Sequence, residues 1–172
     1  QTTLTELMIP SYSNFGGKIH GGILLSLIDK VAYACATRHA GNYCVTVSVD
    51  NVNFLEPVEV GDLVSLHASV NYVGKTSLVI GIKVTAENVR NGIVRHTNTS
   101  YVTMVAKDDD NKPTMVPPLI LESQEEGRRY LEAIRRKELK EKFKSEFDHK
   151  RDELKISESQ EEFTNERCIV AW

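Results

Sequence analysis

The sequence has few cysteines and lacks any apolar run near the length of a membrane helix. Its three cysteines, Cys35, Cys44 and Cys168, are scattered, and none forms a C-x-x-C pair. An odd, scattered set argues against a disulfide framework and favours a reducing compartment, so we expect a cytoplasmic location. A bilayer-spanning helix needs about 20 consecutive apolar residues. The start, QTTLTELMIP, lacks the basic and apolar regions of a signal peptide, so we expect neither a leader nor a membrane segment.

A large excess of charge of either sign is also missing. The 172 residues include 21 Lys and Arg and 24 Asp and Glu, which gives a formal net charge of −3 at pH 7. This balance gives no support to nucleic acid or an anionic membrane as a partner. Apolar residues make up 41% and charged residues 26% of the chain, as in an ordinary globular protein that is long enough to bury a core.

Several catalytic and binding motifs are absent as well. There is no G-x-S-x-G turn, no H-E-x-x-H or closely spaced His/Cys cluster, no G-x-G-x-x-G and no G-x-x-x-x-G-K-[ST]. We therefore expect neither a serine nucleophile on the usual turn nor a metal site. The segment YVGKTS at Tyr72–Ser77 has a Gly-Lys-Thr-Ser run without Walker spacing. It either binds phosphate through its amides and its lysine or is an ordinary turn between two strands.

The distribution of charge divides the chain near residue 121. Of the 45 charged residues, 26 lie in residues 122–172. We predict a folded domain over residues 1–121 and a charged, partly helical C-terminal extension over residues 122–172. The extension has an incomplete apolar stripe, formed by Tyr130, Ile134, Leu139 and Phe143. It is either a solvated helix with i,i+4 ion pairs or a helix that docks on a neighbouring subunit, and the terminal CIVAW is either a small apolar anchor or simply an end.

The pattern of the first domain predicts one long helix followed by strands. Residues Gly22–Ala40 contain no proline and no internal glycine, and Gly41 is a typical helix stop. A helix of this length measures roughly 27 Å. Four segments with strand character follow: CVTVSVDNVNF, LVSLHASVNYV, SLVIGIKVTAENV and IVRHTNTSYVTMVAKD. In the first of them, Val45, Val47 and Val49 alternate onto one face.

These elements predict an α+β fold. An antiparallel sheet wrapped around one long central helix explains why the helix is apolar on nearly every side, because a helix that is enclosed on most sides is buried on most sides. The pair Asn91–Gly92 predicts a type I′ hairpin turn before the last strand, since both residue types tolerate a positive φ.

A short carboxylate, Asp29, lies in the middle of this apolar helix. Helical spacing places it on one stripe with small or apolar residues and no basic partner: Gly22, Leu25, Ser26, Ala32, Tyr33 and Ala36. Burial of an unpaired carboxylate is costly or raises its pKa toward neutrality. The position therefore indicates either a general base, which such a pKa suits, or a structural carboxylate bonded to a nearby hydroxyl or backbone amide.

The segment NFGGKIHGG ahead of the helix supplies other parts of a catalytic site. Its glycines allow close approach of the backbone, and the free N–H groups of a helix start at Gly21 and Gly22 suit a carbonyl oxygen that becomes negative when it is attacked. The Asn14 amide can donate to the same oxygen or hold a water. Together with Asp29, these features indicate acyl transfer. His20 either contacts substrate or, as is commoner at a helix start, caps or packs against the helix.

The motifs N…GxxHGGxLLxxxDxxA, VSVDNVNFLEPVEVGD and VGKTSLVI closely resemble the hotdog-fold acyl-CoA thioesterases of the cytosolic acyl-CoA hydrolase group. The resemblance runs from about Thr5 to at least Lys142. It includes VPPLILESQEEGRRYLEA, which is similar to the C-terminal helical extension of that group. The order and spacing of the motifs together are far more specific than each motif alone. The resemblance implies a hotdog fold, two hotdogs paired through one continuous sheet, and commonly a hexamer of three such pairs.

The resemblance also implies hydrolysis of fatty acyl-CoA to free fatty acid and CoA. Asn14 and Asp29 match the catalytic pair of the family, which comes from opposite hotdogs. Asp29 would be the general base or the nucleophile, and Asn14 with the helix-start amides would polarise the carbonyl. The substrate-binding candidates are His20, Gly21 and Gly22, with Gly74, Lys75, Thr76, Ser77 and Arg95 for the CoA phosphates.

No metal and no organic cofactor is implied, because coenzyme A is part of the substrate and the product. This single hotdog carries both catalytic residues, so we expect a homo-oligomer, a dimer of hotdogs assembled as a hexamer.

Two other functions share features of this sequence. Hydratases and dehydratases of the same fold typically rely on an Asp–His pair on the helix segment, whereas no histidine lies near Asp29 in this helix. A non-catalytic acyl-CoA-binding or sensing protein needs the pocket but would tolerate Asn or Ala in place of Asp29. The carboxylate therefore favours the enzyme.

Overall fold

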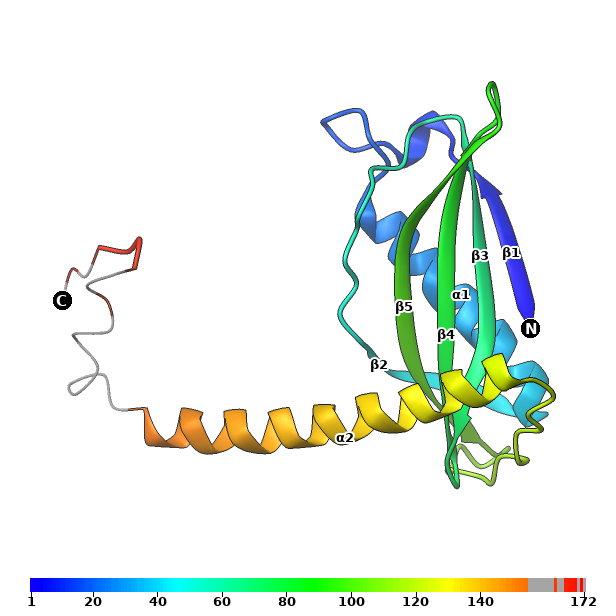
Figure 1. Cartoon of the computed structure of the whole chain (residues 1–172), viewed down its shortest axis with the longest axis vertical. Helices are drawn as coiled ribbons and strands as arrows, with labels where there is room; N and C mark the ends of the chain where they lie inside the picture. The colour runs from blue at the N-terminus through cyan, green and yellow to red at the C-terminus, as the bar shows by residue number, and fades with distance from the viewer. Residues whose placement is uncertain (155–162, 164–165, 170, 172) are drawn as a thin grey trace. The chain divides into compact units, whose positions relative to one another are not determined.

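The computed structural model describes residues 1–154, 163, 166–169 and 171 (Figure 1). The described elements, in chain order, are β1 (Thr2–Leu7), the 3-10 turn η1 (Pro10–Tyr12), α1 (Gly21–Ala40), β2 (Tyr43–Val49), β3 (Asp62–Val73), β4 (Ser77–Asn88), β5 (Ile93–Lys107) and α2 (Gln124–Glu153). The chain divides into two compact units, Gln1–Ala133 and Ile134–Trp172. This division lies within α2, twelve residues after the boundary that the charge distribution predicts.

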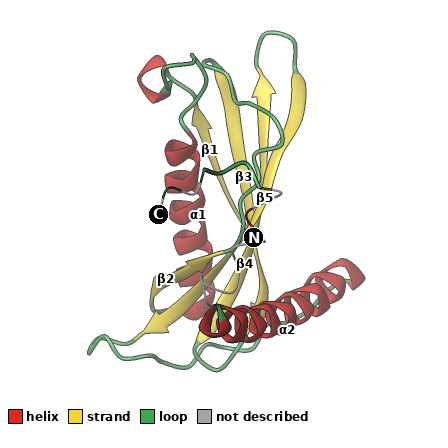
Figure 2. Ribbon diagram, turned by 90° about the vertical axis from the view of Figure 1, so that its left-hand side faces the viewer, coloured by secondary structure: helices red, strands yellow, loops and turns green. Residues whose placement is uncertain are grey.

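The first unit is an antiparallel sheet curled around α1, as the α+β prediction expects. The strand order is β1-β3-β4-β5-β2, so that β1 and β2 are the edges of the sheet. α1 lies along the concave face of this sheet (Figure 2) and contacts all five strands. The core between them is formed by α1 residues such as Leu27, Ile28 and Val31, together with inward-facing residues of β4 and β5 such as Ile80 and Val102.

The bounds of α1 agree with the sequence prediction. His20 is the N-cap, and Gly41 ends the helix in the left-handed conformation with φ 68°. The left-handed conformation favours glycine, because glycine has no Cβ that would clash with the backbone.

The predicted burial of α1 on most sides is wrong for the single chain. The buried residues of the helix lie on the side that faces the sheet, whereas Leu25, Asp29 and Tyr33 are exposed on the opposite side. A single curled sheet covers only one side of a helix, so the apolar residues on the other side have no cover within one chain.

The four predicted strands are present, although β2 ends at Val49, five residues before the end of its predicted segment, and a fifth strand precedes them. β1 pairs with β3 at one edge of the sheet and was not predicted. At the other edge, β2 carries a bulge between Thr46 and Ser48, which interrupts the predicted alternation of its valines. Val47 and Val49 consequently remain exposed, by 60% and 44%.

The hairpin at Asn91–Gly92 is longer than predicted. The loop between β4 and β5 spans residues 89–92, and Gly92 has a φ of 70°. Among the described residues other than glycine, only Asn111 has a positive φ, so Asn91 does not adopt the conformation that a type I′ turn needs. Instead, the Gly92 N–H donates to the Asn88 carbonyl oxygen at 2.8 Å.

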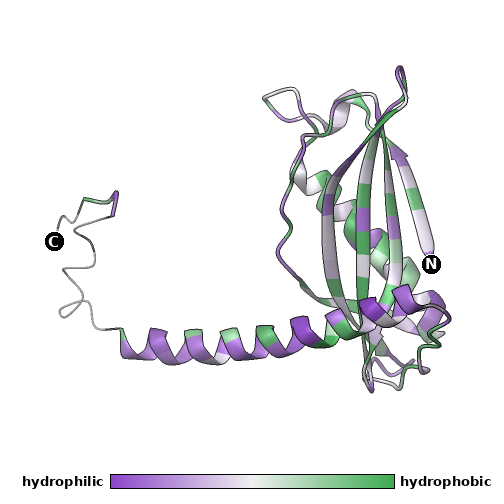
Figure 3. Cartoon of the chain, in the orientation of Figure 1, coloured by the Kyte–Doolittle hydropathy of each residue, from purple (hydrophilic) through white to green (hydrophobic). Residues whose placement is uncertain are grey.

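The second unit contains the C-terminal two thirds of α2, from Ile134 to Glu153, which is predominantly hydrophilic (Figure 3). Ion pairs at i,i+3 and i,i+4 spacing run along it, such as Arg135–Glu138 and Lys142–Glu146. They agree with the predicted solvated helix. Val170 and Trp172 of the terminal CIVAW lie outside the described residues. Within the described part of the chain, no helix is both long and apolar enough to cross a membrane.

Candidate active site

The predicted base, Asp29, is held by a strand residue. The Oγ1 hydroxyl of Thr46, on β2, donates to Asp29 Oδ1 at 2.6 Å, and Met104 Sδ lies 3.2 Å from the same hydroxyl. A hydroxyl has a single proton and a carboxylate is the stronger acceptor, so the short contact to Asp29 dominates. Among the described residues, none donates a hydrogen bond to the other carboxylate oxygen. Asp29 therefore has a fixed orientation and one oxygen left for chemistry.

Asp29 lies in an open depression between α1 and β2. The depression has a volume of about 370 Å³ and is lined by Asp29, Lys30, Tyr33, Tyr43, Cys44, Val45 and Thr46. The rings of Tyr33 and Tyr43 lie 5.9 Å apart at its side, and both side chains are exposed. The apolar enclosure that the sequence predicts around Asp29 is therefore missing in the single chain.

Asn14 lies on the loop after η1, and the backbone fixes its amide group. Its Oδ1 accepts hydrogen bonds from the N–H groups of Gly16 at 2.9 Å and Lys18 at 3.2 Å. Because the oxygen is used inside the loop, the orientation of the amide is defined and the NH₂ group points away from these donors. Asn14 is exposed, so the NH₂ group is available as a donor.

His20 caps α1. Its Nδ1 accepts from the Gly22 N–H at 2.9 Å, which agrees with the capping alternative, and a Cβ at Gly22 would come within 2.9 Å of the same atom. Because the Gly22 N–H is already used, it is not free to bind a carbonyl oxygen. Gly21 lies beside the Phe54 ring, which a Cβ would contact at 3.4 Å.

Asn14 and Asp29 do not form one site within a chain. Asp29 follows the first residue of α1 by eight residues, or roughly 12 Å along the axis. Asn14 lies before the helix start and does not line the depression around Asp29. A single chain therefore presents the amide donor and the carboxylate in separate places.

The candidates for CoA phosphate binding also lie apart. Gly74, Lys75 and Thr76 form the turn between β3 and β4, with the Gly74 N–H donating to the Ser77 carbonyl oxygen at 2.8 Å, and the Lys75 side chain is exposed. Arg95, however, pairs with Ala86, nine residues along β4 from Ser77. This separation is about 30 Å. Within one chain, Arg95 and the turn cannot contact the same phosphate.

The described residues contain no group of three or more His, Cys, Asp or Glu side chains that could hold a metal ion.

Comparison with known proteins places these features in a family. The thioesterase superfamily model matches residues 16–93. Over 137 residues the chain is 45% identical to protein VdlD of Helicobacter pylori, covering 80% of this chain and 78% of that protein. It is 36% identical over 132 residues to the uncharacterized acyl-CoA thioester hydrolase YkhA of Bacillus subtilis, covering 77% of each chain. The chain belongs to the hotdog-fold acyl-CoA thioesterases.

Solved structures of this family share the fold at significant identity. An apo-hexameric acyl-CoA thioesterase superposes with a TM-score of 0.79 at 38% identity, covering 82% of this chain and 90% of that one. The acyl-CoA hydrolase of Staphylococcus aureus, solved with butyryl coenzyme A and coenzyme A, gives a TM-score of 0.78 at 31% identity, covering 88% and 92%. Variants of the S. aureus enzyme with one aspartate, one asparagine or one threonine replaced by alanine have also been solved.

Sequence analysis of this thioesterase missed Thr46. The residue lies in a predicted strand, but nothing in the strand pattern shows that its hydroxyl faces the helix carboxylate. A nearby hydroxyl was one expected partner of Asp29, and the two polar residues among the valines of β2, Thr46 and Ser48, were the available signal.

Proposed function

We propose that this thioesterase hydrolyses fatty acyl-CoA to free fatty acid and CoA, with Asp29 as general base or nucleophile and Asn14 as the donor to the thioester carbonyl. The observation that carries the proposal is the contact between Thr46 and Asp29, which holds an exposed carboxylate in one orientation. Such a carboxylate has a defined direction of attack, as catalysis by a positioned base requires.

The spacing of the three polar residues supports the assignment. In the S. aureus acyl-CoA hydrolase, the replaced asparagine precedes the replaced aspartate by fifteen residues, and the replaced threonine follows the aspartate by seventeen. Asn14, Asp29 and Thr46 have the same two spacings. The fixed Asn14 amide and the hydrogen-bonded Asp29 carboxylate give the same assignment further support.

In the proposed reaction, Asp29 takes a proton from water while the water oxygen bonds to the thioester carbonyl carbon. The carbonyl oxygen becomes negative and accepts a hydrogen bond from the Asn14 NH₂ group. Collapse of this intermediate breaks the C–S bond, and the proton on Asp29 passes to the leaving sulfur. If Asp29 is instead the nucleophile, its oxygen bonds to the carbonyl carbon, the thiolate leaves and water hydrolyses the resulting anhydride.

A second copy of the chain would complete the site. The exposed apolar residues near Asp29 form a patch on α1 and β2: Leu25, Tyr33, Tyr43, Val47 and Val49. β2 is an edge strand, whose unpaired backbone groups can extend a sheet across two chains. In such a pair, we propose that Asn14 of one chain lies at Asp29 of the other, as the resemblance to the family implies. The hexameric state of related thioesterases supports a homo-oligomer built from such pairs.

The turn at Gly74–Ser77 is the proposed binding site for a CoA phosphate, to which it offers a lysine and backbone amides. The relative from Rattus norvegicus, 32% identical over 134 residues, is named a cytosolic acyl coenzyme A thioester hydrolase, which supports a cytoplasmic location for this chain.

The test is the variant Asp29→Asn, assayed by thiol release from acyl-CoAs of short to long chain. We expect kcat to fall by about 10² or more, while the circular dichroism and the oligomeric state remain those of the wild type. Asp110→Asn, at an exposed loop aspartate, is the matched control and should hydrolyse normally. Hydrolysis by Asp29→Asn at the wild-type rate would contradict the proposal. A wild-type chain that binds acyl-CoA without releasing thiol would instead support the sensing alternative.

A further inference from the structure

We propose that the ion pair between the buried Asp62 and the partly buried Arg95 positions the Asn14 amide, through a chain of contacts that crosses two loops. The proposal rests on the catalytic role assigned to Asn14 above. It makes Arg95 and Asp62 positioning residues, since neither reaches the reacting atoms.

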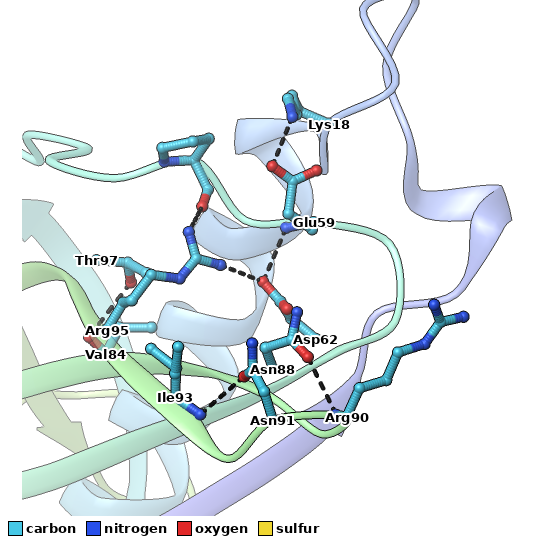
Figure 4. Close-up of polar contacts among 11 residues, drawn as sticks. Lys18, Glu59, Asp62, Val84, Asn88, Arg90, Asn91, Ile93, Arg95 and Thr97 are labelled. Atoms are coloured by element: carbon cyan, nitrogen blue, oxygen red, sulfur yellow. Dashed lines mark hydrogen bonds and ion pairs between the residues drawn. The ribbon is translucent and has the colours of Figure 1, made fainter.

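Arg95 binds two residues at the junction between the β2–β3 loop and β3. From β5, its Nη2 donates to Asp62 Oδ2 at 2.6 Å and its Nη1 donates to the Pro57 carbonyl oxygen at 3.0 Å. Pro57 lies in the loop of residues 50–61 that precedes β3, and Asp62, the first residue of β3, is only 1% exposed. A guanidinium presents its N–H groups in a rigid planar fork, so one side chain fixes the positions of Pro57 and Asp62 relative to each other (Figure 4).

The loop in turn holds the segment that carries Asn14. Asp62 Oδ2 also accepts from the Glu59 N–H at 3.0 Å, which fixes the loop near its end. Glu59 forms a backbone bridge with Lys18, and its side chain accepts from Lys18 Nζ at 2.5 Å (Figure 4). The Ile19 N–H donates to the neighbouring Val58 carbonyl oxygen at 2.9 Å.

Lys18 is also the residue that orients Asn14. The Asn14 N–H donates to the Lys18 carbonyl oxygen at 2.7 Å, and the Lys18 N–H donates to Asn14 Oδ1 at 3.2 Å. A shift of Glu59 therefore moves Lys18, and a shift of Lys18 turns the amide whose NH₂ group is the proposed donor to the thioester carbonyl. The catalytic donor lies on an exposed loop, and this chain of contacts connects it to the edge of the core.

The same geometry argues against a direct phosphate contact by Arg95. Two of its nitrogens already donate to partners in its own chain, and its charge is opposed by a buried carboxylate. The two roles predict different kinetics. A phosphate ligand acts mainly on KM, whereas a positioning residue for the carbonyl donor acts on kcat, because the donor is needed most in the transition state.

The experiment uses the full-length enzyme with Arg95→Lys and Asp62→Asn. Arg95→Lys keeps a positive charge but loses the fork, and Asp62→Asn keeps the shape of the side chain but loses its charge. We expect each variant to lower kcat about tenfold, with KM within about twofold of the wild type. In an Asn14→Ala background, neither change should lower kcat by more than about twofold, because the group that is positioned is already gone.

Hydrogen exchange provides a readout that does not depend on activity. The amides of residues 14–19 should exchange faster in Arg95→Lys and Asp62→Asn than in the wild type. Arg90→Lys is the matched control, because Arg90 lies in the β4–β5 loop and its side chain points away from this cluster (Figure 4). If Arg95→Lys or Asp62→Asn fails to fold, Glu59→Gln tests the same chain of contacts at its exposed end. This variant should also lower kcat.

The outcomes are separable. Unchanged kcat and unchanged exchange in folded Arg95→Lys and Asp62→Asn would overturn the inference. A rise in KM alone in Arg95→Lys would assign Arg95 to the CoA phosphate and also overturn it, as would an equal loss of kcat in the Asn14→Ala background. If Asn14→Ala itself hydrolyses normally, the proposed function fails, whereas faster exchange at residues 14–19 would still show that the ion pair orders the loop.

Discussion

At the scale of single residues, the candidate site depends on one short hydrogen bond. Asp29 is exposed in the single chain, so burial alone does not restrict the orientation of its carboxylate. The Thr46 hydroxyl supplies that restriction by donating to one oxygen at 2.6 Å. A hydrogen bond to a charged group is stronger than a neutral one, and removal of its donor leaves the carboxylate free to rotate. Thr46 should therefore affect turnover without contacting the substrate.

We predict that Thr46→Val lowers kcat by about tenfold or more, since it removes the hydroxyl but keeps a β-branched side chain in β2. Thr46→Ser keeps the donor and should retain most of the activity. Thr103→Val, on β5, is a control that removes a threonine hydroxyl elsewhere in the sheet. Steady-state hydrolysis of acyl-CoA, with thiol release as the readout, measures all three variants. Equal activity of Thr46→Val and Thr46→Ser would show that the hydroxyl has no role.

At the scale of elements, sequence patterns predicted the long ones well. α1 and the strands β3, β4 and β5 are each 12 residues or longer, so their periodicity is unambiguous. β1 has only six residues, and its pairing with β3 depends on a partner far along the chain. The bulge in β2 and the four-residue loop after β4 are equally invisible to a local pattern, because both are set by the register between strands.

Those residues of the candidate site that local sequence patterns mark could be predicted, whereas contacts between distant elements could not. Asn14, His20 and Asp29 stand out locally, as a glycine-rich helix start and as a lone carboxylate in an apolar helix. The Thr46–Asp29 contact joins two elements, and the Asp62–Arg95 pair joins residues 33 positions apart. Such contacts follow from how the elements pack, which no local pattern contains. The exposure of Asp29 also escaped prediction, because the apolar residues of α1 do not show which of them face the sheet.

In the first turns of α2, ion pairs make the stability of the folded state depend on pH in a predictable direction. Two Arg128 N–H groups donate to Glu125, and Arg129 donates to it as well. The hydrogen bonds from Arg128 are the main reason that the pKa of Glu125 falls to about 2 from its ordinary 4.5. A carboxyl group with a lowered pKa in the folded state stabilises that state above the unfolded pKa. This contribution is lost as the pH falls from about 4.5 to about 2.

We therefore predict that Glu125→Gln makes the thermal stability of the protein less sensitive to pH below about pH 5. Between pH 5 and pH 2, the thermal midpoint of the wild type should fall more than that of Glu125→Gln, and added salt should reduce the difference because the pairs are exposed. Thermal unfolding followed by circular dichroism at low ionic strength measures both. Glu56→Gln, at an exposed loop glutamate, should leave this pH dependence unchanged. Equal falls in the thermal midpoint for the wild type and Glu125→Gln would contradict the prediction.

At the scale of the whole molecule, the proposed function makes a single chain only half of an active site. The chain presents Asn14 before α1 and Asp29 in the middle of α1, with no contact between them among the described residues. The exposed rings of Tyr33, on α1, and Tyr43, on the edge strand β2, line the depression around Asp29. A second copy covering these rings would exclude water from the depression, strengthen the electrostatic interactions of the carboxylate and supply the missing amide. Activity should accordingly be a property of the pair.

If the site is shared between two chains, mixed assemblies of two inactive variants should recover a predictable share of the activity. When Asn14→Ala and Asp29→Asn chains are unfolded together in equal amounts and reassembled, random pairing places one chain of each kind in half of the pairs. Each mixed pair has one site with both residues intact and one site with neither, so activity should return to about a quarter of the wild-type value. Each variant reassembled alone should remain inactive. Chains carrying two different tags show whether mixed pairs form. If they form without any recovery of hydrolysis, Asn14 and Asp29 must act within one chain, and the site must be built without the facing subunit.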